Sequence, residues 1–258
     1  MGASWQLMKL QGRIVRRDPA FLVIFFFMPL VVMPLMHRTM GLSLVGSGFA
    51  GASGAEVVVP GQVVLFGFFI AGSVGFAIYR EHGWKTWERL RASATPPGWI
   101  LAGIAAPWVV IHLLYQAALF VAGALLLDLR PLEPENWLGL ALIMVANAVA
   151  SVALMTYISV LLSSIQQVNA VQNVGAMVFG GLGGALAPFE QLPGWAQAVG
   201  RFTPAYWAMR GFRSMLLPQE GAVTVLLVSA AVLMGVGLVS TVAAVRRFRL
   251  EDSKEFFV

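Results

Sequence analysis

The feature that most restricts the fold of this chain is a series of long apolar stretches that carry no charged residue. One of them, residues 137–162, contains no Asp, Glu, Lys or Arg. A helix needs about 20 such residues to cross the roughly 30 Å hydrocarbon core of a bilayer. Inside that core every backbone polar group needs a partner, which a helix supplies within its own segment. The sequence therefore predicts an all-α integral membrane protein.

Six stretches meet this requirement, and we expect one transmembrane domain over residues 1–258. The predicted spans are residues 19–36, 57–79, 98–127, 137–162, 170–187 and 221–245. The second span contains Gly67, Gly72 and Gly75, a small-residue face that allows close packing against another helix. The composition agrees with a membrane protein, because 59% of the residues are hydrophobic and 11% are charged. Soluble domains have about 45–50% apolar and about 25% charged residues.

The basic residues are distributed unevenly between the segments that connect these spans. Twelve of the 17 lysines and arginines fall before the first span, between the second and third, or after the sixth. Because cytoplasmic segments carry the excess of Lys and Arg, this bias places both termini in the cytoplasm. Residues 5–17 mix apolar and basic side chains. They are expected to form an interfacial helix on the cytoplasmic surface, or otherwise a flexible basic tail.

Residues 80–97 are the densest charged stretch between two predicted spans. A charge at the bilayer centre costs about 2.5–3.5 kcal/mol, so this stretch lies outside the hydrocarbon. Trp84, Trp87 and Leu90 share one face of a predicted short helix, which should end at Pro96. An aromatic-faced, charged helix is suited to docking into a groove on a cytosolic partner. The alternative is a solvated loop whose charges only fix the topology.

Residues 188–219 are too polar to span a membrane and too apolar for an ordinary loop. Apolar side chains such as Trp195, Val199 and Phe202 alternate with charged ones. We expect one or two short re-entrant helices that dip into the outer leaflet, which is possible where protein shields the backbone. An ordinary surface helix is the alternative. The residues that mark this segment are Pro188, Pro193, Pro204, Tyr206, Arg210 and Arg213.

The sequence contains no motif for catalysis or for an energy source of its own. The phosphate-binding pattern GxxxxGK[ST] is absent, no histidine pair has metal-ligand spacing, and there is no cysteine. No Asp or Glu falls within a predicted span, which argues against a carrier driven by an ion gradient. We therefore expect a non-enzymatic subunit without a cofactor or metal, driven by another polypeptide. The basic residues flank the spans, so no nucleic-acid partner is expected.

Polar side chains in three of the predicted spans are candidates for a translocation path. They are His112, Tyr115 and Gln116 near the third span's centre, Asn147 in the fourth, and Gln166, Asn169 and Asn173 around the start of the fifth. Buried amides need hydrogen-bond partners, so each group faces either another helix or a wet cavity. Path lining and helix packing are both open for all of them. Otherwise the spans are apolar and aromatic, which favours an amphipathic or lipid-like substrate over a small ion.

Several short motifs occur in a fixed order along the chain. Arg17-Asp18-Pro19 precedes the first span. The charged stretch contains Arg80-Glu81, Gly83, Thr86, Glu88-Arg89-Leu90 and Thr95-Pro96. The segment after the fifth span contains Pro188-Phe189, Leu192-Pro193 and Thr203-Pro204. In this order and spacing the motifs resemble those of ABC-2-type permeases, the membrane subunits of one class of ABC exporters. Trp84-Lys85 interrupts the family pattern between Gly83 and Thr86.

The resemblance implies a six-span half-transporter in a bacterial plasma membrane. It implies a second membrane subunit, identical or related, and two ATP-binding subunits that hold ATP and Mg²⁺. The stretch between the second and third spans would then be the coupling helix that contacts the ATP-binding subunit. The contact residues implied by the family pattern and by the helix face are Arg80, Glu81, Gly83, Trp84, Thr86, Trp87, Glu88, Arg89 and Leu90.

Three functions are compatible with these observations. The leading hypothesis is export of a drug-like or amphipathic substrate, as in antibiotic efflux. The second is export of a lipid-linked polysaccharide or another glycolipid. The third, from a different class, is a membrane assembly factor that works without an ATPase. A neighbouring gene that encodes an ATP-binding subunit would separate the first two from the third.

Overall fold

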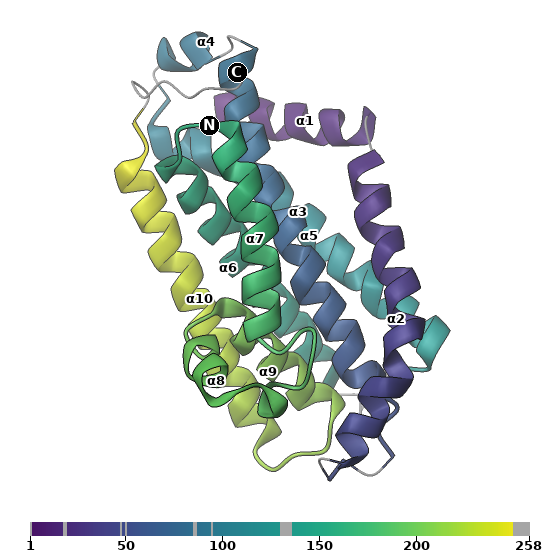
Figure 1. Ribbon diagram of the computed structural model, residues 1–258. Coiled ribbons are helices and arrows are strands. Elements are labelled where there is room, and N and C mark those ends of the chain that lie inside the picture. Colours follow the sequence, from purple (N-terminus) through teal and green to yellow (C-terminus); the bar gives the residue numbers. More distant parts are fainter. Residues whose placement is uncertain are drawn as a thin grey trace.

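The computed structural model describes residues 2–17, 20–46, 48–49, 51–84, 87–93, 95–129 and 136–249. In these segments the chain is helical and contains no strand (Figure 1). The helices are α1 (Gly2–Arg17), α2 (Ala20–Gly46), α3 (Ala55–Gly83), α4 (Trp87–Arg91), α5 (Pro97–Leu127), α6 (Asn136–Leu161), α7 (Ile165–Leu182), η1 (Phe189–Gln191), α8 (Gly194–Gly200), α9 (Pro204–Leu216) and α10 (Ala222–Arg247). The predicted all-α class is therefore confirmed.

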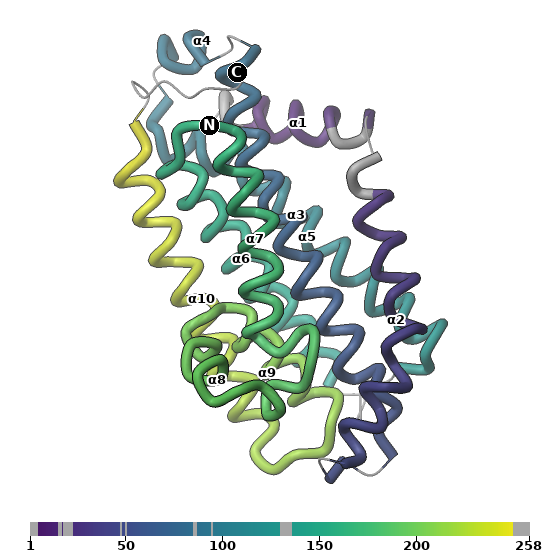
Figure 2. Tube along the Cα trace, in the orientation of Figure 1, coloured from purple at the N-terminus to yellow at the C-terminus, as the bar shows by residue number. Residues whose placement is uncertain are grey.

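Helix α3 is the centre of the bundle and contacts α2, α5, α6, α7 and α9. Its predicted small-residue face makes this packing possible. A Cβ atom at Gly67 would lie 2.5 Å from His112 Nε2, and one at Gly72 would lie 2.5 Å from the side chain of Gln172. Only glycine allows α5 and α7 to approach α3 this closely. The chain path in Figure 2 shows α7 running beside α3 for most of its length.

Five of the described helices are long and apolar enough to cross a membrane. They are Val23–Gly46, Ala55–Gly83, Pro97–Leu127, Asn136–Leu161 and Ala222–Arg247. The predicted fifth span, residues 170–187, corresponds to α7, which has 18 residues and is not one of these five. Helix α7 begins earlier than predicted because Ser164 Oγ caps it by accepting a hydrogen bond from Gln167 N at 3.3 Å. The count of six spans stays a prediction.

Helix α2 is longer than the sequence predicts, because it continues past residue 36 through Gly46. The polar residues in 37–46 are typical of a loop between two spans. In the structure, however, Leu44 is fully buried against the bundle. Gly41 lies directly against the segment before α3, where a Cβ atom would be 2.4 Å from Ser53 O. This tertiary contact keeps the polar turns helical. The predicted end of the first span at residue 36 is therefore wrong, because the helix continues into the segment that connects the first two predicted spans.

The short elements gather at the two ends of the bundle. Helix α1, helix α4 and the last turn of α10 lie at one end, whereas η1, α8 and α9 lie at the other (Figure 1). Helix α1 crosses its end of the bundle and packs against α5. Residues 188–219 form short helices, as predicted, and Thr203 caps α9 by accepting a hydrogen bond from Tyr206 N. The prediction that α8 and α9 dip into the outer leaflet is not tested by these contacts and stays a prediction.

Candidate functional site

The end of α3 is tied to α1 by a buried polar link. Gln11 on α1 is fully buried. Its Oε1 accepts a hydrogen bond from the Arg80 guanidinium, and its Nε2 donates to Glu81 Oε1 at 3.4 Å. Hydrogen bonds to charged groups are stronger than neutral ones. Arg80 and Glu81, both predicted as contacts for a partner, thus fix the position of α1 on the bundle.

Trp87 attaches α4 to the rest of the chain. Its ring stacks on His82 with centroids 3.9 Å apart and meets Phe248 edge-on at 5.5 Å. Its side chain is only 6% exposed. Trp84, by contrast, is 52% exposed and follows directly after α3, with the Arg80 guanidinium 5.2 Å from its ring centroid. The predicted common face of Trp84 and Trp87 is not formed, because α3 extends to Gly83 and α4 begins only at Trp87.

The outward side of this end is a compact surface of mixed charge. We define the α4 surface as Trp84, Glu88, Arg89 and Arg91, which are all exposed. Leu90 is half-buried behind it, and Gly83 is the last residue of α3. Thr86 lies outside the described residues. The α4 surface is therefore a polar patch with one large aromatic side chain, held on a rigid base by Trp87 and Arg80.

The polar residues of α5 and α6 form a hydrogen-bonded seam inside the bundle. Gln116 Nε2 donates to Met144 O at 3.0 Å, and Gln116 Oε1 accepts from Asn147 Nδ2 at 3.0 Å. Ser151 Oγ donates to Asn147 Oδ1 at 3.3 Å. Tyr115 Oη donates to Phe25 O at 3.2 Å. His112 is also fully buried, against Gly67. These contacts favour the helix-packing interpretation for Tyr115, Gln116 and Asn147. For His112, whose two ring nitrogens have no hydrogen-bond partner among the described residues, both interpretations stay open.

The seam predicts a loss of stability when one partner is removed. The substitution Asn147→Leu leaves the amide oxygen of Gln116 and the hydroxyl of Ser151 without their partner. Hydrogen bonds between membrane helices contribute about 0.6–2 kcal/mol each, so the midpoint of thermal unfolding in detergent should fall by a few degrees. The double substitution with Gln116→Leu removes both partners and should recover part of the loss. Gln6→Leu, which changes an exposed amide on α1, should leave the midpoint unchanged. Equal midpoints for Asn147→Leu and Gln6→Leu would contradict the seam.

Helix α7 has one face buried against α3 and one face exposed. Gln172 is buried and its Nε2 donates to Phe69 O at 2.7 Å, so this amide connects α7 to α3. Gln166, Asn169 and Asn173, the predicted path residues, all point away from the chain's own bundle. The same outward face continues with the exposed apolar residues Val174, Met177 and Val178. We call this surface the α7 face: its first half is rich in amides and its second half is apolar.

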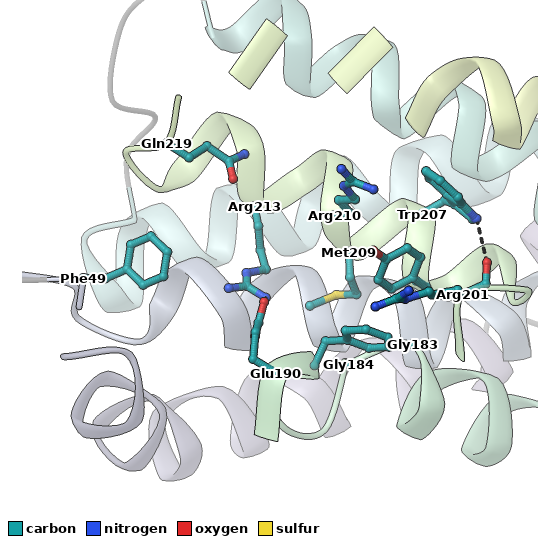
Figure 3. Close-up of a pocket in the computed structure, with 12 residues that line it drawn as sticks. Phe49, Gly183, Gly184, Glu190, Arg201, Trp207, Met209, Arg210, Arg213 and Gln219 are labelled. Atoms are coloured by element: carbon teal, nitrogen blue, oxygen red, sulfur yellow. Dashed lines mark hydrogen bonds and ion pairs between the residues drawn. The ribbon is translucent and has the colours of Figure 1, made fainter. Parts of the chain in front are cut away.

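A cavity of about 480 Å³ lies at the opposite end of the bundle from α4. Its lining comes from the turn after α7, from η1, from α9 and from three residues in the connecting segments, Phe49, Arg201 and Gln219 (Figure 3). Arg201, Arg210 and Arg213 all border it, and Glu190 pairs with Arg213. Arg210, Arg213 and Tyr206 were singled out from the sequence as residues of this segment. Arg201 was not, and no local pattern in the sequence signals that these side chains meet.

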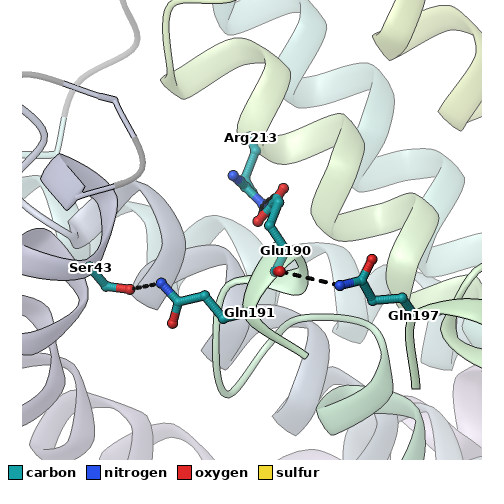
Figure 4. Close-up of polar contacts among 5 residues, drawn as sticks. All are labelled: Ser43, Glu190, Gln191, Gln197 and Arg213. Atoms are coloured by element: carbon teal, nitrogen blue, oxygen red, sulfur yellow. Dashed lines mark hydrogen bonds and ion pairs between the residues drawn. The ribbon is translucent and has the colours of Figure 1, made fainter. Parts of the chain in front are cut away.

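The wall of this cavity is fixed by polar contacts around Glu190 (Figure 4). Gln197 Nε2 donates to Glu190 O at 3.2 Å and to Leu192 O at 2.8 Å. Gln191 donates to Ser43 Oγ, which ties η1 to α2. Pro188 precedes η1, Pro193 precedes α8, and Pro204 is the first residue of α9. These three prolines therefore mark where each short helix begins, which suits their fixed φ.

Comparison with known protein families gives one match. A sequence model of the family described as ABC-2 type transporter matches residues 4–217, which is most of the chain. The matched range begins in α1, includes the α4 surface and ends directly after α9. No curated protein matches the sequence.

Proposed function

Because the chain belongs to the ABC-2 type transporter family, we propose that it is the permease subunit of an ABC exporter whose ATP is hydrolysed by two separate ATP-binding subunits. As a family member it is a multi-pass membrane subunit that works with an ABC ATP-binding partner. The observation that carries the proposal is the α4 surface. It is exposed on its outer side and anchored on its inner side to α3, which is the most buried of the five apolar helices.

The anchoring of α4 suggests how movement of an ATP-binding subunit reaches the bundle. Trp87 stacks on His82, and His82 belongs to the last turn of α3. Arg80 and Glu81, which directly precede His82 in the chain, are hydrogen-bonded to Gln11 of α1. A displacement of Trp84 or Glu88 by the partner would therefore be transmitted to α3 through the stacked rings of Trp87 and His82. The hydrogen bonds of Gln11 would pass the same displacement to α1. Closely packed interiors transmit such displacements because they have little free volume.

The α7 face supports a second permease copy or a related subunit beside this one. Polar side chains that face hydrocarbon are costly, and the α7 face exposes Gln166, Asn169 and Asn173. Asn173 Nδ2 donates to Asn169 Oδ1 at 2.7 Å, but all three amides stay on the outer face of α7. We infer that α7 is the fifth span along the chain, which brings the total to six, and that its amide half borders a path shared with the second subunit. The apolar half of the same face suits the chain of an amphipathic substrate. A drug-like amphiphile and a glycolipid both have this character, and direction out of the cytoplasm is proposed from the resemblance to exporter permeases.

A photocrosslinking experiment tests the partner contact. A photoreactive amino acid at Trp84 should form an adduct with an ATP-binding subunit in membranes of cells that express both. Trp195 on α8 is a matched control, because it is also exposed but lies at the opposite end of the bundle (Figure 1). It should form no such adduct. An ATP-binding subunit attached at position 195 and not at 84 would overturn the proposed docking surface.

A further inference from the structure

We propose that the cavity beside α9 binds the anionic, phosphate-bearing head group of an amphiphile. This site is distinct from the α4 surface and from the α7 face. The cavity volume of about 480 Å³ is within the range of small-molecule sites, which is roughly 300–1,000 Å³. Its lining combines aromatic and small residues with three arginines, and the two kinds are interspersed (Figure 3).

The charges around the cavity do not balance. Arg213 Nη1 lies 3.0 Å from Glu190 Oε1 and 3.2 Å from Glu190 Oε2, so this pair compensates itself. Among the residues that the structure describes, Glu190 is the only acidic residue on the lining, and no carboxylate forms an ion pair with Arg201 or Arg210. Two cations therefore face the cavity without a counter-charge. Arginine binds phosphate through paired N–H donors, which makes phosphate the ligand chemistry that fits.

Trp207 contacts the main chain of Arg201 and the guanidinium of Arg210, so part of the site is formed before a ligand arrives. Trp207 Nε1 donates to Arg201 O at 2.9 Å. The Arg210 guanidinium lies 5.5 Å from the centroid of the Trp207 ring, a cation–π contact that restricts its position. The rings of Phe189 and Tyr206 pack at 4.5 Å between centroids. A preformed site avoids the cost of ordering side chains when the ligand binds.

The segment of the chain around Arg201 indicates why the ligand is an amphiphile. Trp195 and Val199 on α8 are exposed, and Phe202, the neighbour of Arg201, is 90% exposed. Exposed aromatic residues at the end of a membrane bundle are typical of the level of the lipid head groups. A ligand at that level can place a phosphate among the arginines while its chains stay along α8. The cavity therefore takes either a membrane phospholipid or a phosphate-bearing ligand that reaches the same interface.

The test measures lipid binding to the purified full-length chain in a non-ionic detergent. Short-chain phosphatidylglycerol should bind, whereas phosphatidylcholine should bind about tenfold or more weakly, because its choline cation faces Arg201 and Arg210. The double substitution Arg201→Gln with Arg210→Gln removes two charged contacts. It should weaken phosphatidylglycerol binding by about tenfold or more. Arg38→Gln on α2 is the charge-matched control and should bind as the unchanged chain does, since Arg38 is exposed and outside the cavity.

A second variant acts in the opposite direction and keeps the proposal testable if the double variant does not fold. Glu190→Gln releases Arg213 from its carboxylate, so phosphatidylglycerol should bind more tightly. Displacement of the lipid by glycerol 3-phosphate would show that the phosphate ester alone is sufficient for binding. Lack of displacement would show that the site needs the whole lipid. The proposal is overturned if phosphatidylglycerol and phosphatidylcholine bind equally. It is also overturned if binding is unchanged in both the arginine and the Glu190 variants.

Discussion

Exchanging the charges of the α4 surface, by Glu88→Lys together with Arg89→Glu, should abolish ATP-driven transport while the protein still folds and inserts. Both side chains are exposed, and the buried contacts of Trp87 anchor α4 without them. A docked partner would meet like charges where it now meets opposite ones, which costs several kcal/mol. Since each 1.4 kcal/mol is a factor of ten, transport should fall on the order of a hundredfold.

The measurement is substrate transport and ATP hydrolysis by the reconstituted complex, taken together. We expect hydrolysis to persist or to become independent of substrate while transport is lost. The paired substitution Arg38→Glu with Glu220→Lys is the matched control, because it makes the same kinds of charge change at exposed positions away from α4. It should transport normally. Transport at the unchanged rate by the Glu88 and Arg89 variant would show that these charges do not couple the two subunits.

Local sequence patterns predicted those parts of the fold that depend on local chemistry. Uninterrupted apolar stretches predicted α3, α5, α6 and α10, because the bilayer requires them to be helical. The glycines of α3 predicted a close approach by another helix, and both α5 and α7 make one. The end of α2 was missed for a tertiary reason. Its last turns are polar, and they stay helical because Leu44 and Gly41 pack against other parts of the chain.

The candidate site was harder to predict because long-range contacts decide which side chains are exposed. Helical spacing placed Trp84 and Trp87 on one face, yet Trp87 is buried by His82 and by Phe248 from the far end of the chain. On α7 the helical spacing of the amide residues does not predict that Gln172 faces α3 while Asn169 faces outward. The hydrogen bond between Gln116 and Asn147 could likewise be predicted only by knowing how α5 packs on α6.

Replacing Gly61 with alanine should lower the stability of the whole bundle. A Cβ atom there would lie 2.3 Å from Ala185 O and 3.2 Å from Ala185 C. These are backbone atoms, so no side chain can rotate to relieve the overlap. The turn that contains Ala185 is itself held by a hydrogen bond from Ala185 N to Gly180 O at 2.9 Å. Overpacking of this kind costs typically 1–3 kcal/mol, so the thermal unfolding midpoint in detergent should fall by several degrees.

Gly235 on α10 is the matched control for this substitution. It also lies inside a long apolar helix, but a Cβ atom at Gly235 would meet nothing within 4 Å. Alanine is favoured over glycine in a helix by about 1 kcal/mol, so Gly235→Ala should keep or raise the midpoint. A fall for Gly61→Ala together with no fall for Gly235→Ala separates the contact with Ala185 from the general effect of the substitution. If both variants unfold at the midpoint of the unchanged chain, the close packing of α3 against the turn after α7 is not what stabilises this side of the bundle.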